Sequence, residues 1–209
     1  MYKCFMILSF VTLYNIGQSQ VHGGFQQYYY TGGGVSSIVP KIYYQSRKNW
    51  YGELRYNYEE SQTVSLNAGK MFSHKQLFSY SITPVAGIVF GKLNGITIGT
   101  NAAIDYKKLF LSSEFQYTFS VDEKAKNLFF NWSEYGYQIT KPIYAGIALQ
   151  VTHHYSLKNI WEPGIMMGWI YKSWTFPVYV FNPFGGNPNF VAGINWEWTR
   201  VDKKKKPVF

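Results

Sequence analysis

Residues 96 to 119 read ITIGTNAAIDYKKLFLSSEFQYTF and alternate between apolar and small or polar side chains along two arms that meet at Lys107-Lys108. In an extended strand, every second side chain lies on the same face. The apolar face would hold Ile96, Ile98, Thr100, Ala102, Ile104 and Tyr106 on the first arm, and Leu109, Leu111, Ser113, Phe115, Tyr117 and Phe119 on the second. The pattern predicts a β-hairpin in which Tyr106 pairs with Leu109 and Asn101 with Glu114, because this register keeps paired residues on one face.

The opposite face of this hairpin is small or polar, and Phe110 is its only large apolar residue. The composition of the whole chain is equally unusual, since 20% of the residues are aromatic and only 15% are charged, against about 25% charged in an average soluble protein. A soluble sandwich or a lipocalin-like barrel would carry more surface charge. The hairpin is therefore interpreted as a wall between lipid and a polar interior.

Similar alternating runs continue from about residue 21 to residue 199. Their approximate spans are Gly24 to Tyr30, Ser37 to Gln45, Trp50 to Glu59, Gln62 to Phe72, Phe78 to Phe90, Gly95 to Tyr106, Leu109 to Phe119, Leu128 to Ile139, Ile143 to Tyr155, Gly164 to Tyr171, Trp174 to Asn182 and Asn189 to Thr199. Most of these runs have the length of a tilted membrane-spanning strand, about 9 to 11 residues. They predict an all-β fold, an antiparallel transmembrane β-barrel of about 12 strands, with 10 or 8 strands as alternatives.

The connections between these runs fall into two sets. Every second connection is short and cationic, as at Lys107-Lys108 and Lys172-Ser173, whereas several of the others are longer and richer in Gly, Pro or Asn. Bacterial outer-membrane barrels have tight periplasmic turns and longer external loops. An even number of strands then places both termini on the periplasmic side.

The first twenty residues, MYKCFMILSFVTLYNIGQSQ, have one cation, a short apolar run and a small or polar end. This arrangement is typical of a secretory signal peptide, and the apolar run is too short to span a membrane. The chain is therefore divided into a signal peptide (1–20), a barrel (21–199) and a basic tail (200–209). Cys4 is the only cysteine, so the mature chain is expected to have no disulfide, no thiol nucleophile and no cysteine metal site.

Aromatic residues gather near the predicted strand ends, as at Tyr28-Tyr29-Tyr30, Phe129-Phe130 and Trp196 with Trp198. Membrane interfaces favour amphipathic rings. The last run, NFVAGINWEW (189–198), resembles the terminal strand that the assembly machinery of Gram-negative barrels recognises, and the whole chain resembles the small outer-membrane barrels of Bacteroidota. The resemblance implies location in a Gram-negative outer membrane, with lipid and the assembly machinery as partners. The chain departs from this pattern in the basic tail that follows Trp198.

The formal net charge is +9, but most cations fall in the predicted turns and the tail, so a nucleic-acid partner is not expected. The residues predicted to line the lumen are Lys41, Glu53, Arg55, Glu59, Asn101, Asp105, Glu114, Gln116, Glu134, His154, Asn195 and Glu197. Two outcomes are open for this set. Its charges could pair and fill a narrow lumen, or an acid-rich wet lumen could favour cations and repel anions.

One short motif could carry chemistry. His154 and Ser156 resemble part of the motif in two families of outer-membrane lipid hydrolases, which implies His154 as base and Ser156 as nucleophile, with Asn159 or Glu162 to orient the base. Those families place Asn directly after the Ser, whereas this chain has Leu157, and alternation puts the pair in the lumen rather than on the outer wall. The pair is interpreted as ordinary lumen or loop residues, and the protein is not expected to be an enzyme.

Three functions remain as hypotheses: a narrow porin-like channel or small-solute transporter, a plugged structural or secretion-associated barrel that binds partners through its loops or tail, and a lipid hydrolase. Small solutes, or a periplasmic partner at Lys203–Lys206, are the candidate ligands. No cofactor and no metal site are expected, because His153 and His154 lie on opposite faces of one strand and cannot chelate a common ion.

Overall fold

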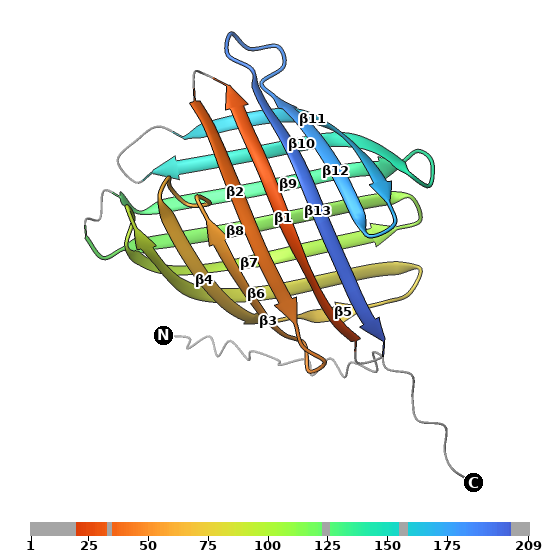
Figure 1. The fold of residues 1–209 in the computed structure, drawn as a ribbon. Coiled ribbons are helices and arrows are strands. Elements are labelled where there is room, and N and C mark those ends of the chain that lie inside the picture. Colours follow the sequence, from red (N-terminus) through yellow and green to blue (C-terminus); the bar gives the residue numbers. More distant parts are fainter. Residues whose placement is uncertain (1–19, 33–34, 123–125, 155–158, 202–209) are drawn as a thin grey trace, which may run out of the picture.

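The computed structural model is a closed antiparallel β-barrel, and it describes residues 20–32, 35–122, 126–154 and 159–201. Its strands are β1 (Gln20–Gly32), β2 (Val35–Gln45), β3 (Trp50–Tyr56), β4 (Thr63–Lys70), β5 (Phe72–His74), β6 (Phe78–Gly91), β7 (Gly95–Tyr106), β8 (Leu109–Ser120), β9 (Leu128–Gln138), β10 (Ile143–His154), β11 (Ile160–Tyr171), β12 (Trp174–Phe181) and β13 (Asn189–Val201). Each strand pairs with its neighbours in sequence, except that β4 and β5 both pair with β6 and not with each other. β13 returns to pair with β1 (Figure 1).

The barrel has twelve strands because β4 and β5 are two parts of one strand. Both pair with β6 in a continuous register, from Gly69 opposite Val85 to Phe72 opposite Ile82. The interruption faces Pro84, which has no N–H to donate to the ladder. The prediction of a 12-stranded barrel is therefore confirmed, and the alternatives of 10 or 8 strands and of a soluble sandwich are excluded.

The hairpin of residues 96 to 119 forms β7 and β8 in the predicted register. Tyr106 lies opposite Leu109, Ile104 opposite Leu111 and Asn101 opposite Glu114. Lys107 adopts a φ of 56° at the turn, the left-handed region that tight hairpin turns use.

Three predicted strand ends were wrong by three residues or more. β1 begins at Gln20 rather than Gly24. β3 ends at Tyr56 rather than Glu59, because Asn57 adopts a φ of 57° and the chain turns there. β11 begins at Ile160 rather than Gly164. Residues 160 to 163 can continue the strand because they lie opposite β10, from Thr152 to Leu149.

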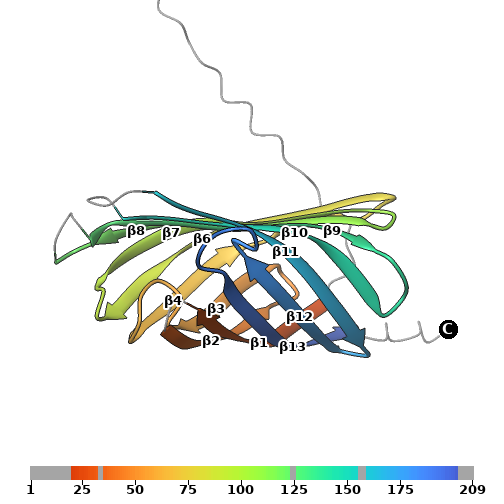
Figure 2. The same ribbon diagram turned by 90° about the horizontal axis from the view of Figure 1, so that it is seen from above.

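The barrel has two distinguishable ends and two broad sides. Gln20, Val201 and the short connections, such as Lys107-Lys108, lie at one end, here called the terminal end, and the longer connections lie at the other, here called the loop end (Figure 1). From above, β6 to β10 form one side, and β1 to β4 with β12 and β13 form the other (Figure 2).

The outer wall of the barrel is apolar. Outward side chains such as Ile98, Ile147 and Val178 are 50%, 60% and 50% exposed. Near the terminal end of β11 to β13, a row of outward rings is formed by Trp169, Tyr171, Trp174, Phe176 and Trp196. Apolar walls with aromatic girdles are typical of outer-membrane barrels. None of the described residues forms a helix long and apolar enough to cross a membrane.

This outer wall predicts a strong penalty for charge at its middle. Ile147 lies on β10 opposite Tyr135 and Ile165, which are also exposed. We expect Ile147→Lys to lower the free energy of unfolding in lipid by about 2–4 kcal/mol, measured by urea titration of the barrel in vesicles. Ile147→Leu should leave it unchanged, and so should Phe184→Lys, since Phe184 is 99% exposed in the β12–β13 loop. Equal losses for all three variants would contradict a lipid-facing position.

Inside, several large rings lie against glycines of the wall. A Cβ atom at Gly168 would collide with the ring of Tyr144, and one at Gly136 would collide with Phe110. Tyr144 and Phe110 themselves pack edge to face, with ring centroids 5.5 Å apart. These glycines allow a narrow barrel to enclose an aromatic core, described in the next section.

Candidate functional site: the barrel lumen

The lumen contains two cavities, one nearer each end of the barrel. The lower chamber, on the side of the terminal end, has a volume of about 300 Å³, and the upper chamber, on the side of the loop end, about 290 Å³. Tyr30, Val39 and Tyr58 line both cavities and separate them. We call these three residues the constriction.

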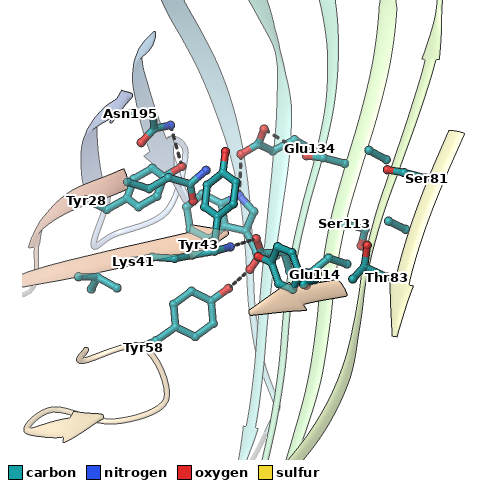
Figure 3. A pocket seen from close by; sticks show the side chains of 18 of the residues that line it. Tyr28, Lys41, Tyr43, Tyr58, Ser81, Thr83, Ser113, Glu114, Glu134 and Asn195 are labelled. Atoms are coloured by element: carbon teal, nitrogen blue, oxygen red, sulfur yellow. Dashed lines mark hydrogen bonds and ion pairs between the residues drawn. The ribbon is translucent and has the colours of Figure 1, made fainter. Parts of the chain in front are cut away.

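A network of buried charges fills the lumen beside the lower chamber. Arg55 Nη2 lies 2.6 Å from Glu53 Oε1, and Lys41 Nζ lies 2.5 Å from Glu114 Oε1. In addition, Lys41 Nζ lies 3.6 Å from Glu53 Oε2, and Arg55 Nη2 lies 3.4 Å from Glu114 Oε2. Because Lys41 and Arg55 lie on β2 and β3 while Glu114 lies on β8, their ion pairs with Glu114 cross the lumen and join opposite walls. The pair of Lys41 with Glu114 is drawn in Figure 3. The pairs with Glu53 stay within β3 and its neighbour β2.

Neutral groups complete this network. Tyr51 Oη donates to Glu53 Oε2 at 2.7 Å, and Asn67 Nδ2 donates to Glu53 Oε1 at 3.1 Å. Arg55 Nη1 donates to Gln116 Oε1 at 3.0 Å, and Gln116 in turn donates to Glu59 Oε1 at 2.7 Å. Additional hydrogen bonds offset part of the cost of burying charges, so these partners help to hold the network in one arrangement. Arg55 Nε, Asn67 Oδ1 and Glu59 Oε2 are buried with no partner among the described residues.

Tyr58 closes the constriction and comes from a loop rather than a strand. It lies in the turn between β3 and β4, with its hydroxyl donating to Glu114 Oε2 at 2.5 Å (Figure 3). The guanidinium of Arg55 lies 4.0 Å from its ring centroid, and the ring packs edge to face on Phe130 at 5.1 Å. The ring is therefore fixed from three directions across the passage between the chambers.

The opposite half of the lumen is aromatic. Trp132 packs edge to face on Tyr179 at 5.0 Å and on Phe181 at 5.1 Å, and Tyr28 lies 6.1 Å from Trp132. The buried residues of this core are Tyr144, Ala148, Met166, Tyr179, Phe181 and Val191. The lumen is thus narrowed by charge pairing on one side and by ring packing on the other.

Glu134 is the carboxylate of this aromatic half. Its Oε1 accepts from Trp132 Nε1 and from Tyr179 Oη, both at 2.7 Å, and its Oε2 accepts from Ser112 Oγ at 3.4 Å. Asn195 Nδ2 donates to Tyr28 Oη at 3.2 Å, between the neighbouring strands β13 and β1 in the wall of the same chamber (Figure 3). The Oδ1 atom of Asn195 is buried and has no partner.

The structure places the residues predicted to line the lumen in three groups. Lys41, Asn101, Glu114, Glu134 and Asn195 line the lower chamber. Glu53, Arg55, Glu59 and Gln116 are buried in the charged network. Asp105, Glu197 and His154 lie on the inner face by register, Asp105 and Glu197 near the terminal end and His154 near the loop end.

The interpretation of all end-of-strand aromatics as membrane-interface residues was wrong for part of the set. Tyr28 and Tyr30 line the lower chamber, and Phe130 lines the upper one, whereas Tyr29 is outward and exposed. Strict alternation could have shown this, since adjacent residues cannot share a face. Tyr58 and the contacts of Trp132 and Tyr179 could not be found this way, because they depend on elements far apart in sequence.

The candidate hydrolase residues do not form a described site. His154 lies on the inner face of β10 opposite Leu128, and Ser156 lies outside the described residues. Glu162 accepts hydrogen bonds from Gln150 and Asn189 in the upper chamber, and Asn159 is exposed. Within the described part of the chain, no group of three or more His, Cys, Asp or Glu side chains could hold a metal ion.

Comparison with known proteins supports the fold. No family model and no curated protein matches the chain. Among solved structures, the KdgM porin is similar with a TM-score of 0.61, 13% identity, and coverage of 83% of this chain and 98% of that one. The NanC porin gives a TM-score of 0.58 and 9% identity, with the same coverage of 83% and 98%. A second KdgM structure, described as a complex with disordered oligogalacturonate, gives 0.59 and 13%, covering 84% and 98%.

At these identities the likeness establishes the barrel fold. A closed antiparallel barrel with an apolar outer wall is the architecture that spans the Gram-negative outer membrane. The chain is an outer-membrane β-barrel protein. Residues 1–19 of the predicted signal peptide and the Lys203–Lys206 segment lie outside the described residues, whereas Gln20 is the first residue of β1.

Proposed function

We propose that the protein is a narrow, porin-like channel for small solutes. The observation that carries the proposal is the pair of chambers, arranged one above the other along the lumen and separated by the constriction of Tyr30, Val39 and Tyr58. Each chamber lies at the lower end of the range for small-molecule pockets, about 300–1,000 Å³. A passage of this size suits small solutes better than polymers.

A plugged barrel is the second candidate, and the charged network favours it. Lys41, Glu53 and Arg55 are buried, and the ion pairs of Lys41 and Arg55 with Glu114 join opposite walls. In that case the loops or the Lys203–Lys206 segment would bind partners and nothing would pass. We propose the channel first, because a plug packed along the whole lumen would not leave a chamber on each side of the constriction.

Planar-bilayer recording separates these two candidates. We expect the purified, folded barrel to give small, discrete conductance steps in KCl, because the constriction limits the flow rather than blocking it. Empty detergent micelles provide the blank, and heat-modifiable gel migration confirms that the inserted protein is folded. A folded barrel with no steps would contradict the channel and support the plug.

We further propose that the protein is not an enzyme and that it comes from a member of the Bacteroidota. The first proposal is supported by the inward position of His154, away from membrane lipid. The second is supported only by the likeness of the sequence pattern. The oligogalacturonate named for KdgM is a polyanion, which the acidic interior of this barrel does not favour.

A further inference from the structure

We infer that this lumen passes cations and excludes anions, and that Glu134 and Glu162 determine the preference. The inference rests on the proposed channel function and adds the charge of the solute. The preference would come from the electrostatic field along the lumen rather than from a fixed ion-binding site.

The inner face of the barrel carries more carboxylates than cations. Among the described residues, strand register and hydrogen bonding place seven carboxylates and two cations inside the barrel. The carboxylates are Glu53, Glu59, Asp105, Glu114, Glu134, Glu162 and Glu197, and the cations are Lys41 and Arg55. The interior is therefore acidic, although the whole chain has a formal net charge of +9.

Both inner cations are paired with the same two carboxylates. Lys41 and Arg55 both contact Glu53 and Glu114, and no other described carboxylate forms an ion pair with them. These four charges cancel one another within the network. The remaining inner carboxylates set the field that a solute meets.

Among the described residues, Glu134 and Glu162 are the two carboxylates that line the chambers without a cationic partner. Glu134, in the lower chamber, accepts from Trp132, Tyr179 and Ser112, all of which are neutral. Glu162, in the upper chamber, accepts from Gln150 Nε2 at 3.2 Å and from Asn189 Nδ2 at 2.6 Å, which are also neutral. Each chamber thus presents one negative charge on its wall.

Narrow passages with low-dielectric walls strengthen such charges, because field lines are confined and salt screens poorly. Rings of carboxylates have this effect in cation channels. The cations of the short connections, such as Lys107, Lys108 and Lys172, lie at the terminal end of the barrel and outside the chambers, so they do not cancel the field inside. A permeant cation is attracted at both chambers, whereas an anion is repelled twice.

The test is the reversal potential of the folded barrel in a KCl gradient across a planar bilayer. We expect K⁺ to be at least about tenfold more permeant than Cl⁻. The double variant Glu134→Gln and Glu162→Gln should lose most of this preference while still conducting, because glutamine keeps the side-chain size and an accepting oxygen. Tetramethylammonium chloride in place of KCl tests whether organic cations share the path.

Glu60→Gln is the matched control. Glu60 lies in the external β3–β4 turn, where Lys92 Nζ approaches its Oε1 at 3.5 Å and both side chains are partly exposed, so its neutralisation should leave the K⁺ preference unchanged. Conduction without a preference for K⁺, or a double variant as selective as the parent, would overturn this inference and leave the channel intact. Absence of any conductance would instead overturn the channel function itself.

Discussion

Tyr58→Ala is expected to raise the single-channel conductance severalfold. The ring of Tyr58 lies between the two chambers and is held there by Glu114, Arg55 and Phe130. Its removal joins the chambers through a wider passage, and the resistance of a pore is dominated by its narrowest part. The measurement is the step size in planar bilayers at fixed KCl concentration.

Two matched variants separate the loss of the ring from other effects. Tyr58→Phe keeps the ring and removes only the hydroxyl that donates to Glu114, so its conductance should stay close to that of the parent. Tyr56→Ala removes a tyrosine two residues earlier that is exposed on the outer wall, and it should not change the step size. An unchanged step in a folded Tyr58→Ala barrel would show that the passage is limited elsewhere.

Arg55→Met is expected to cause the largest loss of stability. The side chains of Arg55 and Glu53 are 1% and 0% exposed, and removal of the guanidinium leaves the Glu53 carboxylate buried with Lys41 as its only cation, 3.6 Å away. Breaking a buried ion pair costs about 3–5 kcal/mol, because the remaining charge cannot regain its hydration. The free energy of unfolding in urea, followed by tryptophan fluorescence in vesicles, measures the loss.

Lys92→Met provides the exposed counterpart. Its pair with Glu60 is 3.5 Å long and both side chains remain in contact with solvent, so its removal should cost no more than about 1 kcal/mol. Arg55→Lys should fall between the two, because it retains the charge and loses the planar fork that reaches both Glu53 and Gln116. Similar losses for Arg55→Met and Lys92→Met would contradict the structural role of the network.

The wall of the barrel could be predicted residue by residue. In the hairpin of residues 96 to 119, the side-chain period of two and the short turn at Lys107-Lys108 leave a single register that keeps the apolar side chains together, and β7 and β8 adopt it. The prediction failed where alternation stops. The chain turns at Asn57, so the predicted strand ending at Glu59 became a loop that reaches into the lumen.

The partners inside the lumen could not be predicted in the same way. The alternation of side chains along the strands identified inner-face residues such as Lys41 and Glu114, but the contact between these two joins positions 73 residues apart. The same holds for Tyr28 with Asn195, which are 167 residues apart. Alternation along a strand gives the face on which a side chain lies. The side chain that it contacts depends on how the tilted strands close around the barrel axis.

The sequence by itself determined the class of fold, the strand pairing and the apolar outer wall, because these depend on local alternation and on the length of each strand. Only the tertiary structure decided that the loop residue Tyr58 joins Tyr30 and Val39 in separating two chambers. It also decided that, among the described residues, Lys41 and Arg55 neutralise Glu53 and Glu114 and leave Glu134 and Glu162 without a cation. The physical reason is that charge pairing and ring packing act across the closed barrel, between residues that the chain order does not bring together.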